Sequence, residues 1–162
     1  MSPKDIFIGN NKFEPGDKDV AGEFCSRNGR RFYKIANYDG MDRFFMSITN
    51  PDNVWLFISS TGGITCGREN SDNALFPYTT EDRVAESAGN TGSFTLFRVE
   101  KDDKQYLWEP FASAGEDPYR ISRNLYKSIY GDQVIFEEVN HDLNLVFSYG
   151  WEASPKWGIH RM

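Results

Sequence analysis

An alternation of side-chain character over residues 135–151 is the sequence feature that most constrains this fold. Successive side chains of a strand point to opposite faces, so period two is the signature of a half-buried strand. Apolar residues nowhere recur at helical spacing for three turns. The segment therefore predicts antiparallel strands with a turn at 140–142. The odd positions are Ile135, Glu137, Val139, His141, Leu143, Leu145, Phe147, Tyr149 and Trp151, against Glu138, Asn140, Asp142, Asn144 and Ser148 on the even ones.

Turn signals divide most of the remaining chain into further strands. Asn28-Gly29 separates strand-like runs at 23–26 and 31–36, and this dipeptide is the strongest short hairpin signal. Other runs lie at 43–49, 54–59, 93–100, 105–111 and 119–129, which gives nine or ten strands. We therefore predict an all-β, antiparallel β-sandwich with fewer than about 15% of its residues in helices.

The length and the polar N-terminus set the domain organisation. Residues 1–20 are polar and contain Pro15-Gly16, which predicts a loosely packed lead-in with at most one short strand. Residues 21–162 are expected to form a single β-sandwich domain. A chain of this length buries roughly 70% of its unfolded surface, so the fold does not need a metal ion or a disulfide bond to be stable.

Charge and cysteine content exclude several classes of partner. The net charge of −6 disfavours nucleic acid and anionic membranes, which need a cationic face. Cys25 and Cys66 are too few and too far apart to indicate a zinc site, and we predict neither metal nor cofactor. No signal peptide or membrane span is recognisable, which favours a cytoplasmic protein.

The stretch 55–83 contains the candidate binding residues. Trp55–Ile58 reads as a buried strand, with Trp55 in the core; Thr61-Gly62-Gly63 then breaks the strand, and the loop that follows has almost no periodicity. Its mixture of charges, amides and aromatic rings suits a polyhydroxylated ligand, or else a structural loop that satisfies its own backbone. The candidate ligand-binding residues are Arg68, Asn70, Asp72, Asn73, Tyr78, Asp82 and Arg83, with Trp108 or Trp157 near enough to stack on a sugar ring.

Catalytic signatures are missing from the sequence. The only histidines are His141 and His160, no nucleophile elbow is present, and the glycines at 62, 63 and 67 are read as turn residues rather than as a phosphate loop. We therefore assign no catalytic residue. The alternative is a mutarotase-like or hydrolytic enzyme that uses Glu69 or Asp72 with His141.

The order of these elements resembles the N-terminal β-sandwich domain of cellobiose phosphorylases and related inverting glycoside phosphorylases and hydrolases. The likeness covers about residues 32–151. It rests on the order of several features along the chain. A Ser-Thr-Gly-Gly turn comes first, followed by a loop with basic residues, a segment that contains a tryptophan, a strand that contains a tyrosine, and a final hairpin. These are Ser60-Thr61-Gly62-Gly63, Arg68, Arg83, Trp108, Tyr126 and the hairpin at 134–149.

The resemblance implies a supersandwich fold, like that of galactose mutarotases, placed before an (α/α)₆ catalytic barrel. That family's domain is longer than 162 residues, so we expect a truncated chain that would contact missing downstream domains and pair as a homodimer. The first functional hypothesis is a non-catalytic, carbohydrate-associated domain with weak sugar affinity. A ligand-free protein interaction domain is the further alternative.

Overall fold

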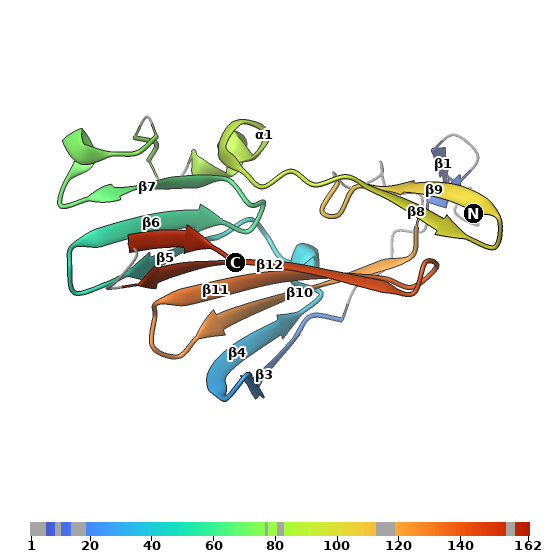
Figure 1. Cartoon of the computed structure of the whole chain (residues 1–162), viewed down its shortest axis with the longest axis horizontal. Helices are drawn as coiled ribbons and strands as arrows, with labels where there is room; N and C mark the ends of the chain where they lie inside the picture. Colours follow the sequence, from blue (N-terminus) through green and yellow to red (C-terminus); the bar gives the residue numbers. More distant parts are fainter. Residues whose placement is uncertain are drawn as a thin grey trace, which may run out of the picture.

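The computed structural model describes residues 6–8, 11–13, 19–76, 78–80, 83–112, 119–154 and 158–162 (Figure 1). Strands account for 53% of the chain and helices for 11%, so the expected low helix content is confirmed. All strand pairs in the described part are antiparallel. The chain is therefore all-β, with a sandwich-like arrangement of sheets.

The larger sheet has six strands in the order β13-β12-β11-β10-β4-β3. Asn28 and Gly29 take φ values of 50° and 77° between β3 and β4, which confirms the predicted hairpin, since a tight turn needs two positive φ angles there. The strands are β3 (Ala21–Arg27), β4 (Arg30–Ala36), β10 (Ile121–Ser128), β11 (Gln133–Asn140), β12 (Leu145–Ser154) and β13 (Gly158–Arg161).

Three smaller sheets accompany the six-stranded one. The first comprises β5 (Phe45–Thr49), β6 (Val54–Ser59) and β7 (Ile64–Arg68); the second is the hairpin β8 (Phe97–Lys101) and β9 (Lys104–Trp108). The third pairs β1 (Ile6–Ile8) with β2 (Asn11–Phe13), so the lead-in has two short strands rather than at most one. The helices are the 3₁₀ turns η1 (Tyr38–Gly40), η2 (Ser71–Asn73) and η3 (Val84–Ser87), and α1 (Ala88–Thr91). No helix within the described ranges is long and apolar enough to cross a membrane.

Strand β7 is the principal difference from the sequence prediction. Its segment Ile-Thr-Cys-Gly was expected to be aperiodic loop, yet all four residues are buried and pair with β6. A strand covered on both faces has no polar face, so it shows no alternation. Gly67 is required by a close approach rather than a turn, because a Cβ there would lie 2.6 Å from Cζ2 of Trp55.

The alternation over 135–151 changes phase at its turn. Phe136 pairs with Tyr149 and Val139 with Val146, so even positions of β11 share a face with odd positions of β12. On β11 the buried side is therefore even and includes Val134, Phe136, Glu138 and Asn140. The antiparallel strands are confirmed, but the odd face of β11, which the apolar pattern would place inside, is only half-buried.

The core lies between the three-stranded and six-stranded sheets. Leu56 and Ile58 of β6 are fully buried against Leu125 of β10 and Phe136 of β11. Because side chains alternate along β6, Trp55 points to the outer face and is half-buried, which corrects its expected place in the core. There it packs edge to face on Tyr78, with ring centroids 6.0 Å apart.

The opposite face of the six-stranded sheet carries a polar network. Glu137 accepts hydrogen bonds from Tyr126 (2.7 Å), Asn124 (3.0 Å) and Arg27 (3.0 Å), while the Arg27 guanidinium lies over the Tyr126 ring. Partial burial alone would raise the pKa of Glu137. These donors outweigh burial and hold its pKa below the usual range, so the carboxylate is charged near neutral pH.

Candidate functional site

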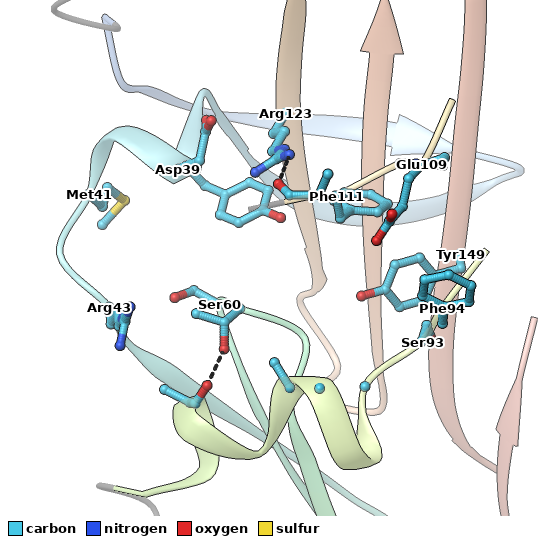
Figure 2. Close-up of a pocket in the computed structure, with 18 residues that line it drawn as sticks. Asp39, Met41, Arg43, Ser60, Ser93, Phe94, Glu109, Phe111, Arg123 and Tyr149 are labelled. Carbon is cyan, nitrogen blue, oxygen red and sulfur yellow. Dashed lines mark hydrogen bonds between the residues drawn. The ribbon is translucent and has the colours of Figure 1, made fainter. Parts of the chain in front are cut away.

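The candidate site is a cavity of about 580 Å³ over the middle of β12. Two separate sheets cover the core-facing side of the six-stranded sheet. Ala153 of β12 lies in the core that the six-stranded sheet shares with β5–β7, and Phe147 of β12 packs against Phe97 of β8. Tyr149 lies between these two residues and lines the cavity (Figure 2). The volume of the cavity is in the range of ordinary small-ligand pockets.

The Ser-Thr-Gly-Gly turn fixes one wall of this cavity. The Thr61 hydroxyl donates to the Ala85 carbonyl (2.9 Å), and the Ile64 N–H donates to the Thr91 hydroxyl (3.0 Å). Gly63 lets η3 and α1 approach the turn, because a Cβ at residue 63 would overlap the Val84 carbonyl oxygen. The wall residues Ala85, Ala88 and Gly89 therefore depend on the absence of a side chain at 63.

A buried carboxylate organises another part of the lining. Glu138 is fully buried and accepts from Arg123 Nε (2.8 Å), Trp108 Nε1 (2.9 Å) and the Phe111 N–H (2.7 Å). A second Arg123 nitrogen donates to the Ala112 carbonyl at 2.7 Å. These bonds hold β9, the chain after it and β10 together, which positions Phe111, Ala112 and Arg123 at the cavity.

Two tyrosine hydroxyls remain available to a ligand. Within the described residues, no hydrogen-bond partner is found for the hydroxyls of Tyr38 and Tyr149, and the Ser93 Oγ is buried without one. Figure 2 shows the Tyr149 hydroxyl directed into the cavity. Burial raises the pKa of both tyrosines, so each keeps its proton and can donate a hydrogen bond at neutral pH.

The charged groups around the cavity leave a small excess of negative charge. Asp39 and Glu109 supply carboxylates, Arg43 supplies a cation, and the charge of Arg123 is already compensated by Glu138. The site therefore lacks the excess positive charge that a phosphate or polyanion needs. The rings of Phe94 and Phe111 provide apolar faces, and Phe94 is 71% exposed.

The structure gathers most of the predicted loop residues at one end of the three-stranded sheet, around η2 (Figure 1). Asn70 caps that turn, because its Oδ1 accepts from the Asp72 N–H (3.1 Å) and from Asn73 Nδ2 (3.2 Å). Arg68 donates to the Asp52 carbonyl at 3.3 Å. Part of the loop thus satisfies its own backbone, as the structural alternative expected.

Other predicted site residues lie apart from η2 or outside the described residues. Trp108 is on β9, only 2% exposed, with its indole N–H bonded to Glu138, so it offers no stacking face to the loop. Arg83 is at the start of η3. Asp82 and Trp157 fall outside the described residues. None of the described members of the predicted set lines the cavity.

The histidine and carboxylates of the enzymatic alternative are not assembled either. His141 is in the turn between β11 and β12, where its Nε2 lies 2.9 Å from the Ser122 hydroxyl. Asp72 is part of η2, and Glu69 precedes it in the chain. Figure 1 shows η2 and the turn that carries His141 at opposite ends of the molecule. In the described parts of the chain, no group of three His, Cys, Asp or Glu residues is arranged to hold a metal ion.

The cavity residues could not be found from the sequence because they come from six separate segments without a common motif. The signal that could have pointed there is the Ser-Thr-Gly-Gly turn, which forms part of the lining through Ser60 and Thr61. In comparisons with known proteins, no protein-family model matches this chain and no curated protein matches it.

Proposed function

We propose that this domain binds a neutral sugar in the cavity beside Tyr149, as a non-catalytic accessory domain of a carbohydrate-active enzyme. One observation carries the proposal: protonated tyrosine hydroxyls that have no hydrogen-bond partner among the described residues border a cavity of sugar-compatible volume. Sugars present alternating hydroxyls and apolar ring faces. The hydroxyls of Tyr149 and Tyr38 can donate to the sugar hydroxyls, and Phe94 can stack on a ring face.

The resemblance to the N-terminal domains of cellobiose phosphorylase-like enzymes supports a β-glucoside as the ligand. The supersandwich class and the contacts with downstream domains are part of the same proposal. Affinity should be about millimolar, roughly −4 kcal/mol, because a few hydrogen bonds in an open site must offset the entropy lost on association.

Replacing Tyr149 with phenylalanine should weaken the binding of cellobiose about two- to twelvefold, because one hydrogen bond contributes roughly 0.5–1.5 kcal/mol. The fold should keep its stability, since the hydroxyl bonds no other described residue. Isothermal titration calorimetry measures the affinity, and urea unfolding measures the stability. Tyr130→Phe, at an exposed tyrosine outside the cavity, is the matched control and should bind as the wild type does.

The enzymatic alternative is tested with the same protein. Incubation with aryl β-glucosides should release no product above background. Hydrolysis that disappears in Glu109→Gln, at a carboxylate of the cavity, would replace the binding function by a catalytic one. Equal, measurable affinities of Tyr149→Phe and the wild type would place the sugar site away from Tyr149. Absence of binding to every sugar by the wild type would leave the ligand-free interaction domain as the better account.

A further inference from the structure

The turn that follows β9 carries a phenylalanine in a strained conformation. Glu109, Pro110, Phe111 and Ala112 all line the cavity, and the Ala112 N–H donates to the Glu109 carbonyl at 3.2 Å. Proline at the second position and a φ of 64° at the third identify a type II β-turn. The third position of such a turn needs a positive φ, which favours glycine or asparagine. This chain places the bulky Phe111 there instead.

Phe111 stands apart from the other residues of this protein in the left-handed region. The other non-glycine residues with positive φ in the described part of the chain are four asparagines, two aspartates and a glutamate. Asparagine and aspartate tolerate this conformation because their short polar side chains bond the nearby backbone, whereas a bulky side chain is a genuine outlier there. Strained residues of this kind cluster at ligand-binding sites.

The surrounding structure holds the strained turn from two sides. The buried Glu138 carboxylate accepts from the Phe111 N–H at 2.7 Å, and Arg123 donates to the Ala112 carbonyl at 2.7 Å. Arg123 and Glu138 are themselves ion-paired at 2.8 Å, and Pro110 is buried. A strained conformation persists only where its neighbours fix it in this way.

The Phe111 ring is held in one orientation beside the Tyr149 hydroxyl. Figure 2 shows it between Arg123, whose guanidinium carbon is 5.8 Å from the ring centroid, and Tyr149, whose ring meets it edge to face at 5.3 Å. Phe94, the other phenylalanine of the cavity, is 71% exposed and makes no ring contact within the described residues. A ring that is already fixed loses less conformational entropy when a ligand binds, so Phe111 is the better stacking partner.

We propose that Phe111 is the ring on which the sugar stacks, and that the Glu109–Ala112 turn is kept strained in order to present it. This role rests on the proposed sugar binding and names the kind of ligand that the cavity prefers. That ligand is a pyranose with an apolar C–H face, rather than an open-chain polyol with a similar set of hydroxyl groups.

Titration with glucose and with sorbitol, followed by amide chemical shifts, tests the stacking role. The wild type should bind glucose about tenfold more tightly than sorbitol, which offers similar hydroxyl groups without a rigid ring face. Phe111→Leu keeps the apolar volume and the same strained backbone, and it should reduce this ratio to about one. Phe94→Leu is the matched variant and should keep most of the ratio.

The wild-type protein provides a second test that does not depend on any substitution. Nuclear Overhauser contacts should connect the Phe111 ring protons with the C–H protons of bound glucose. Absence of any binding by the wild type would overturn the sugar-binding function and this role together. Glucose binding with an unchanged ratio in Phe111→Leu, or with contacts to Phe94 alone, would overturn only the role of Phe111.

The strain in the turn is tested without any sugar. Alanine normally gives a more stable protein than glycine, because glycine loses more conformational freedom on folding. At residue 111 the order should reverse, and Phe111→Gly should unfold at a higher urea concentration than Phe111→Ala, since glycine adopts the left-handed conformation without steric cost. Glu109→Gly and Glu109→Ala, at the first position of the same turn, should keep the usual order. The usual order at residue 111 as well would overturn the strained presentation of the ring.

Discussion

Replacing Glu138 with alanine should lower the free energy of unfolding by about 3–5 kcal/mol, because the substitution leaves the Arg123 charge buried without its partner. Glu138 is fully buried, and the Arg123 side chain is only 12% exposed. The Trp108 indole N–H and the Phe111 N–H would lose their acceptor as well. Urea unfolding, followed by circular dichroism, measures the loss.

The control for this substitution is another ion-paired carboxylate, Asp142. It pairs with Arg120, whose side chain is 79% exposed, and Asp142→Ala should cost only about 0–1 kcal/mol because water screens the pair. A cost for Glu138→Ala no larger than that of the control would show that the buried network does not organise this region. The stability cost of Glu138→Gln, which keeps one acceptor oxygen, should lie between those of Glu138→Ala and Asp142→Ala.

Replacing Gly63 with alanine should destabilise the fold by about 1–3 kcal/mol or more, because the added methyl group overpacks the contact between the turn and η3–α1. The new Cβ would overlap the Val84 carbonyl and lie 2.8 Å from the Ser87 Oγ and 2.9 Å from the Ala88 nitrogen. Two of these three atoms belong to the backbone and cannot rotate away. Thermal and urea unfolding both report the change.

Gly89→Ala is the matched control, since a Cβ at this glycine of α1 meets nothing within 4 Å. It should be neutral or stabilise the protein by up to about 1 kcal/mol through the better helix propensity of alanine. Gly63→Ala should also weaken sugar binding beyond its effect on stability, because η3 and α1 form a wall of the cavity. Equal stability of the two variants would contradict the close-packing role of Gly63.

Local turn chemistry explains why much of the fold could be predicted. Asn28-Gly29 and Asp102-Asp103 both take positive φ angles in two-residue hairpin turns, and such signals depend only on neighbouring residues. β7 could not be found in this way, because covering both of its faces removes the alternation. The phase change between β11 and β12 also escaped, since it depends on which residues the turn at 141–144 brings opposite each other.

The candidate site depends on contacts between segments distant in sequence, and no local pattern encodes these. Glu138 looks like a solvent-facing residue in its strand, but the register places it on the core side beneath Trp108 and Arg123. The alternating pattern places Tyr149 only on a half-buried face, and its location in the cavity follows from its position between the two covering sheets. Conversely, the side-chain oxygen of Asn70, which the sequence offers to a ligand, is used to cap η2.

Amide chemical shifts during titration with glucose, cellobiose and longer β-glucans test the sugar-binding cavity most directly. Binding there should move resonances of residues 38–43, 60–61, 85–94 and 109–112, together with Tyr149, and the shifts should saturate in the millimolar range. Shifts confined to residues 68–80 would return the site to the loop around η2. No shift at tens of millimolar sugar would contradict a carbohydrate-binding function for the domain.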